Sequence, residues 1–72
     1  MTAGHSQKNL TPREIECLEW LGRGLTNGAI AKQLGITVAT VALHLTNARV
    51  KLGAATREQA LVIALKRGLI DP

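Results

Sequence analysis

Residues 26–53 read TNGAIAKQLGITVATVALHLTNARVKLG, and this stretch decides the fold. Its apolar residues recur at three- and four-residue intervals on both sides of Gly35, which is the pattern of two short amphipathic helices joined by a tight turn. Two helices that cross closely need a small residue at the crossing, a glycine in the turn and an apolar residue that closes the angle. Ala31, Gly35 and Val41 supply these three, so the stretch predicts a helix-turn-helix unit.

A further helix precedes this unit, and its ends are marked by local signals. Thr11 and Glu14 have the spacing of a capping box, and Pro12 between them occupies the first helical position. The helix is expected to end near Arg23, because Gly24 is suited to the left-handed conformation that follows a helix.

The same signals, a polar cap before an apolar run and a glycine after it, mark three more helices. They are expected over residues 27–34, 38–52 and 57–67. The last opens with a second capping box, formed by Thr56 and Gln59. The sequence thus predicts an all-α fold, a four-helix bundle-like helix-turn-helix domain.

The composition agrees with a small helical domain. The chain has 72 residues, enough for one domain with a small core, and 46% of them are hydrophobic although there is one Trp and no Phe or Tyr. Aliphatic residues must supply the core, which favours helices over a sheet. Residues 1–9 are polar and lack periodicity, and we interpret them as a disordered tail, a linker or an expression remnant. Residues 10–72 then form the domain.

The sequence also excludes several classes of function. Cys17 is the single cysteine, and together with His5 and His44 it is too little for a disulfide framework or a structural zinc site. We expect no cofactor and no enzyme activity, because there is no metal-ligand set, phosphate-binding loop or activated nucleophile. No apolar run reaches the roughly 18 to 20 residues of a membrane span, and there is no signal peptide, so we expect a cytoplasmic protein without a membrane partner.

The charges are distributed unevenly along the chain. The formal net charge is +4, and no acidic residue occurs between residues 24 and 57, a stretch that holds Lys32, Arg49, Lys51 and Arg57. Nucleic acid is the commonest partner for such an uncompensated basic surface. An anionic membrane, an acidic protein and an ordinary solvated face remain as alternatives at this point.

Three segments of the chain resemble one family. The LTPREIECL start, the stretch from Gly24 to Gly53 and the final TREQALVIALKRGLI are similar to the DNA-binding domain of the LuxR family of bacterial transcription factors, also called GerE- or FixJ-type. The resemblance spans Leu10 to Ile70. The arrangement of His44 and Asn47 resembles the quorum-sensing branch of that family. The resemblance implies four helices, the third in the DNA major groove and the second across the backbone.

Candidate DNA contacts come from two sources. Asn27 and Thr37 lie at helix N-termini, where unpaired backbone N–H groups and the helix dipole favour phosphates. Carried over position by position, the resemblance implies that Ala42, Leu43 and Thr46 face the bases. It implies contacts with phosphates or base edges at Thr26, Lys32, Thr40, His44, Asn47 and Lys51.

The chain departs from the family directly after Val41, which is expected to be buried. Many members carry Lys or another polar residue there, and this chain has Ala42. Hydrogen-bond readout at that position is lost. Ala42, Leu43 and the methyl group of Thr46 are suited instead to thymine methyl groups. Arg49, further along the helix, is expected to supply the missing polar contact.

The last predicted helix has more apolar residues than one buried face needs. A core stripe at helical spacing is expected from Ala60, Leu61, Ala64 and Leu65. Val62 and Ile63 then lie at its margin or in solvent, beside Lys66, and they predict a subunit contact. The resemblance also implies a homodimer through this helix, with two recognition helices about 34 Å apart on an inverted-repeat site.

Two hypotheses of different class follow. The first is sequence-specific binding of double-stranded DNA in bacterial transcription regulation, by a dimer. The second is a helix-turn-helix-like interaction module that contacts RNA polymerase or another regulator without reading DNA. Ala42 and the apolar residues of the third helix favour the second hypothesis, and the basic stretch favours the first.

Overall fold

The computed structural model describes residues 9–71, and in this part of the chain all regular secondary structure is helical. The tail expected over residues 1–9 lies outside the described residues, apart from Asn9. The helices are α1 (Pro12–Gly22), α2 (Asn27–Leu34), α3 (Val38–Lys51) and α4 (Arg57–Lys66). The all-α prediction is confirmed, and each helix begins and ends within one residue of its expected bounds.

Each helix begins at a threonine that caps it. The hydroxyl oxygens of Thr11, Thr26, Thr37 and Thr56 accept hydrogen bonds from backbone N–H groups three residues further on. Such a cap stabilises a helix by about 1 kcal/mol. The capping box of α1 is complete, whereas that of α4 is not. The Oε1 atom of Gln59 accepts from the N–H of Ala55, not from that of Thr56, so the prediction of a second capping box is half wrong.

The turn between α2 and α3 depends on Gly35. This glycine has φ +68°, a left-handed conformation that side chains with a Cβ atom rarely adopt. The N–H groups of Gly35 and Ile36 both donate to the carbonyl of Ala31, which ends α2 and redirects the chain. As a result α2 and α3 are inclined at 106° to one another.

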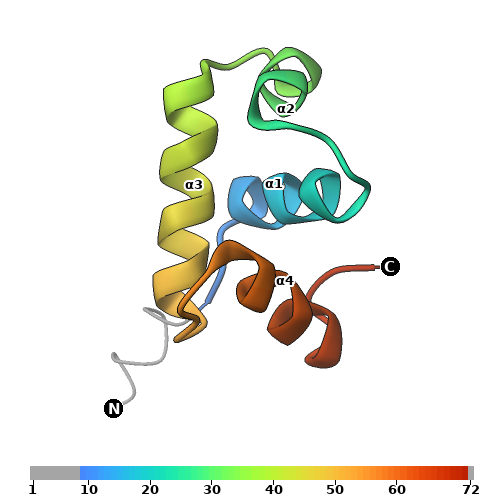
Figure 1. The fold of residues 1–72 in the computed structure, drawn as a ribbon, viewed down its shortest axis with the longest axis vertical. Coiled ribbons are helices and arrows are strands. Elements are labelled where there is room, and N and C mark those ends of the chain that lie inside the picture. Colours follow the sequence, from blue (N-terminus) through green and yellow to red (C-terminus); the bar gives the residue numbers. More distant parts are fainter. Residues whose placement is uncertain (1–8, 72) are drawn as a thin grey trace.

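The core lies between α3 and the other three helices. In Figure 1, α3 forms one side of the molecule, and α1, α2 and α4 are stacked against it. Its predicted apolar stripe of Val41, Leu45, Ala48 and Leu52 is buried throughout. The side chains that meet this stripe are Cys17, Leu18, Ile30, Ala31, Ala54, Ala60, Ala64 and Ile70.

The prediction for α4 was wrong at Leu65, whereas Ile63 is partly buried at the margin of the core, as expected. Ile63 packs against the core, whereas Leu65 is 39% exposed. The reason is the position of the buried centre, which lies at Ala60 and Ala64. At about 100° per residue, Ile63 lies about 80° from the midline of these two alanines, at the margin of the buried face, and Leu65 lies about 120° from it.

The sequence argues against a membrane span, a metal site and a reactive cysteine, and the described residues can be compared with each of these. Among residues 9–71 no single helix is long and apolar enough to cross a membrane, and only α2 and α3 taken together, across their bend, meet that composition. No group of three or more His, Cys, Asp or Glu side chains in this range is placed to hold a metal ion. Cys17 is fully buried, and burial raises the pKa of its thiol, so the thiol is protonated at neutral pH.

Candidate nucleic-acid interface

The N-termini of α2 and α3 present exposed polar groups. Thr26 and Thr37 are both exposed, and their hydroxyl oxygens lie 3.2 and 3.1 Å from the backbone nitrogens that they cap. The Oγ1 atoms of Thr37 and Thr40 are 2.8 Å apart, so both hydroxyls are held at the same end of α3. The first-turn N–H groups without helical partners give each end a partial positive charge, which attracts phosphate.

The side of α3 that faces away from the core is open along its length. We call its exposed residues the outer face of α3, and they are Ala39, Ala42, Leu43, Thr46, Asn47 and Val50. The three residues expected to face bases, Ala42, Leu43 and Thr46, all belong to it. His44 is half-buried beside this face, and Val41 on the opposite side is fully buried, as predicted.

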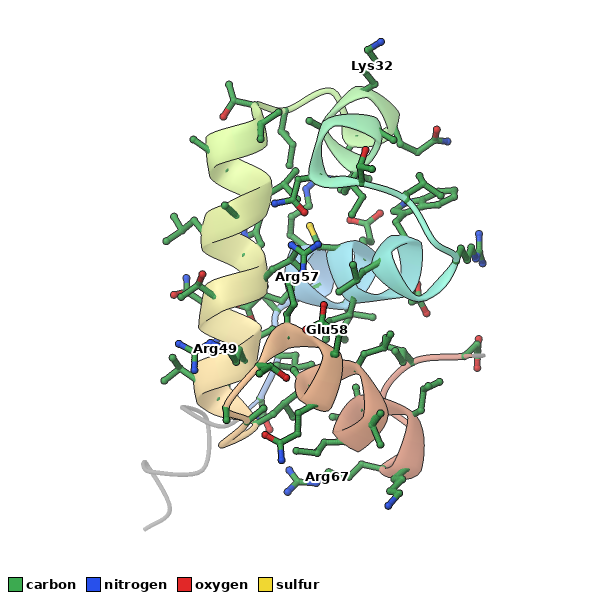
Figure 2. The ribbon with its side chains drawn as sticks, viewed as in Figure 1. Lys32, Arg49, Arg57, Glu58 and Arg67 are labelled. Carbon is green, nitrogen blue, oxygen red and sulfur yellow. The ribbon has the colours of Figure 1, made fainter. Side chains whose placement is uncertain are left out.

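The basic side chains of this region differ in what they contact. Figure 2 shows Lys32 projecting from α2 into solvent, and among the described residues it forms no ion pair. Arg49 is half-buried, and its NH1 group donates to the carbonyl oxygen of Ala54 at 3.0 Å. This bond draws the guanidinium toward the C-terminal end of α3. This position does not support the polar base contact expected from Arg49. The remaining N–H groups of the guanidinium can still donate hydrogen bonds to a phosphate.

Arg57 is a candidate contact that the sequence analysis did not select. Its NH1 group donates to Oδ1 of Asn27 at 2.9 Å, which ties the start of α4 to the start of α2. Both residues line a hollow of about 220 Å³, together with Ala42, Leu45, Thr46 and Arg49. Two guanidinium groups therefore border one concavity beside the outer face of α3. The only signal in the sequence for a DNA contact by Arg57 was its position at the end of the stretch without acidic residues.

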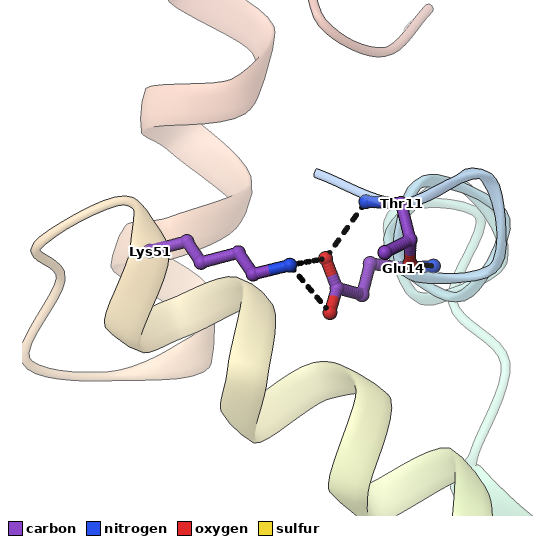
Figure 3. A network of polar contacts seen from close by, with 3 residues as sticks. All are labelled: Thr11, Glu14 and Lys51. Carbon is purple, nitrogen blue, oxygen red and sulfur yellow. Dashed lines mark hydrogen bonds and ion pairs between the residues drawn. The ribbon is translucent and has the colours of Figure 1, made fainter. Parts of the chain in front are cut away.

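Lys51 forms an ion pair that the sequence analysis did not predict. Its ammonium lies 2.9 and 3.1 Å from the two carboxylate oxygens of Glu14, and Oε1 of Glu14 also accepts from the N–H of Thr11 at 2.9 Å (Figure 3). Glu14 is 3% exposed and Lys51 24%. Because this carboxylate neutralises its charge, we leave Lys51 out of the interface.

Burial and bonding have opposite effects on Glu14. Burial alone would raise the pKa of its carboxyl group, since it removes the charged form from water. The hydrogen bonds from Thr11 and Lys51 and the charge of Lys51 outweigh burial, and the pKa is lowered from its ordinary value of 4.5. Glu14 is therefore ionised at neutral pH, and it joins α1 to α3.

A separate apolar patch lies on α4 and the turn after it. We call it the α4 patch, and it consists of Val62, Leu65 and Leu69, which are exposed and spaced three and four residues apart. Lys66 is exposed beside it. Of the residues expected at a subunit contact, Val62 belongs to this patch, and Ile63 is partly buried and packs against the core.

The fold agrees with the comparisons to known proteins. The model of the family described as bacterial regulatory proteins, luxR family, matches residues 8–64. The chain belongs to the luxR family. The solved structure of the transcription factor GerE superposes with a TM-score of 0.83 at 37% identity, over 86% of this chain and 92% of that one. The helix-turn-helix fold is thereby confirmed.

Curated luxR-family relatives give the same result. The quorum sensing-dependent transcriptional regulator VjbR of Brucella abortus is 47% identical over 86% of this chain, and the transcriptional activator LuxR of Aliivibrio fischeri is 44% identical over 92%. The chain spans 24% and 26% of these two relatives, about a quarter of their length. These relatives are named as transcription regulators, and a luxR-family helix-turn-helix domain is a DNA-binding domain of transcription regulation.

Proposed function

We propose that this domain binds duplex DNA sequence-specifically, with α3 in the major groove and α2 across the backbone. The observation that carries the proposal is the outer face of α3, which is uncovered and bordered by Arg49 and Arg57, while Lys32 is exposed on the neighbouring α2. An α-helix fits the major groove, and basic groups beside it can meet the phosphates.

The proposed contacts fall into two groups. Ala42, Leu43 and Thr46 face base edges. The phosphates, or the base edges next to them, are contacted by Thr26, Asn27, Lys32, Thr37, Thr40, His44, Asn47, Arg49 and Arg57. Phosphate contacts fix the position of the domain on DNA, and base contacts give the specificity.

The α4 patch supports a homodimer. Val62 and Leu65 of α4 and Leu69 of the turn after it are three exposed apolar side chains close together in the sequence and separate from the outer face of α3. A twofold dimer through these side chains pairs the patch with itself and sets two α3 helices about 34 Å apart, one turn of DNA. Its operator is then an inverted repeat.

The regulatory context is proposed from the relatives. VjbR is named as a quorum sensing-dependent regulator, and LuxR as a transcriptional activator. We propose that this domain serves as the DNA-binding part of a quorum-sensing response in the cytoplasm, where RNA polymerase is a further partner.

Binding to duplexes from a random pool, measured by fluorescence anisotropy at two salt concentrations, tests the proposal. Three cations at phosphates predict a log–log slope of affinity against salt of about −2.7, or roughly a 40-fold loss between about 50 and 200 mM salt. The apolar outer face of α3 also favours an interaction module that docks on a protein. That candidate predicts no salt-dependent affinity for any duplex, and this result would overturn the DNA proposal.

A further inference from the structure

The outer face of α3 carries no charged side chain. Its six residues are three small or hydroxyl-bearing side chains, one amide and two large aliphatic side chains, Leu43 and Val50. These two are 57% and 63% exposed. An exposed leucine and valine two turns apart on the helix proposed to enter DNA are unfavourable in water unless a partner covers them.

The cations of α3 are held away from this face. The guanidinium of Arg49 is bonded to the carbonyl of Ala54 beyond the end of the helix, and the ammonium of Lys51 is bonded to Glu14 on the core side. The commonest specific base contact is a bidentate bond from Arg or Lys to guanine. Neither side chain is placed to make it.

Aliphatic side chains have one complementary feature in the major groove, the C5-methyl group of thymine. Leu43 and Val50 are separated by two helical turns, about 10.5 Å along the axis. With base pairs about 3.4 Å apart, a helix lying along the groove sets these side chains roughly three base pairs apart. Ala39 and the methyl group of Thr46 lie on the same face, beside the line that joins them.

We propose that the domain recognises its operator half-site through thymine methyl groups, with Leu43 and Val50 as the residues that determine this specificity. The inference rests on the DNA binding proposed above and names the feature that is read. It extends the contacts expected from the sequence to Val50, and it assigns Arg49 to the backbone.

Replacement of thymine by deoxyuridine tests the inference, because this change removes the C5-methyl group and leaves pairing and charge unaltered. A duplex is first selected from a random pool, and each thymine of its half-site is then replaced in turn. Each contacted methyl group is expected to contribute about fourfold in affinity, so two replacements weaken binding by about fifteenfold. Deoxyuridine outside the half-site leaves the affinity unchanged.

Protein variants link the effect to the named residues. Leu43→Ala and Val50→Ala change exposed side chains and leave the fold intact, and each is expected to remove the thymine-to-uracil difference at one position of the half-site. Val38→Ala is the matched control, since Val38 is an exposed valine of α3 outside the outer face. It retains the full difference.

The two proposals fail in different ways. If selected duplexes bind with the expected salt dependence but deoxyuridine has no effect, thymine readout is wrong and DNA binding stands. If no duplex binds in a salt-dependent manner, both are wrong.

Discussion

The ammonium of Lys51 and the carboxylate of Glu14 form an ion pair between residues 37 positions apart in the sequence, with an Nζ–Oε1 distance of 2.9 Å. The pair joins the last turn of α3 to the first turn of α1 (Figure 3). Because Glu14 also completes the capping box of α1, one carboxylate both starts a helix and fixes the proposed recognition helix against it. A residue to which the resemblance assigned a DNA contact thus takes part in the packing of the scaffold.

The two partners of this pair are expected to differ in their effect on stability. Lys51→Met leaves an almost fully buried carboxylate without its counter-ion, which costs about 3 to 5 kcal/mol. Glu14→Gln leaves a quarter-exposed ammonium that reaches water, and it costs about 1 to 3 kcal/mol. Urea unfolding followed by circular dichroism measures both. Equal losses would show that the pair is solvated in solution.

The pair also predicts how stability depends on pH. The pKa of Glu14 is lowered in the folded state, so the unfolded chain takes up the proton first as the pH falls. The contribution of ionised Glu14 to the free energy of unfolding is complete above its ordinary pKa of 4.5. It is lost as the pH falls through the lower pKa of the folded state. We expect the free energy of unfolding to fall below about pH 4.5. The fall should be smaller in Glu14→Gln, and parallel curves for the two proteins would contradict this account.

Salt dependence separates Lys32 from Lys51. Lys32→Met removes one proposed phosphate contact, and the magnitude of the log–log slope should fall by about 0.9. The double variant Glu14→Gln/Lys51→Met removes one charge of each sign and keeps the net charge unchanged. Its slope is expected to equal that of the unsubstituted domain in anisotropy titrations. A reduced slope in the double variant would return Lys51 to the DNA interface.

Dimerisation through the α4 patch predicts a difference between half-sites and full sites. Leu65→Glu places a charge in the patch and is expected to abolish cooperative binding to an inverted repeat, with the affinity for a single half-site retained. Sedimentation velocity on both duplexes measures the stoichiometry. Arg23→Gln, which makes the same change in net charge at the residue after α1, is the control. Cooperative binding by Leu65→Glu would show that the dimer uses another surface.

Most of the fold was predictable because its signals are local. A threonine before each helix and a glycine after it set boundaries through contacts within a few residues, as at Thr37 and Gly35. The face that a helix buries is set by its neighbours. In α4 apolar residues occur all around the axis, so the sequence did not reveal that Leu65 faces solvent.

The candidate site was predictable in part for the same reason. The caps and the exposed positions of α3 follow from helical spacing. The bond between Arg57 and Asn27 joins residues 30 positions apart, and the one between Lys51 and Glu14 spans an even longer interval. Only the packed helices bring such partners together, and these two contacts decide which cations remain available to DNA.

An amide chemical-shift titration with a mixed-sequence duplex, at about 50 and 200 mM salt, tests the central claim most directly. The account predicts shifts at Asn27, at Lys32 and along residues 37–50, with an affinity that falls roughly 40-fold between the two conditions. Amides that stay unchanged there, while only Val62, Leu65 and Leu69 report self-association, would contradict it.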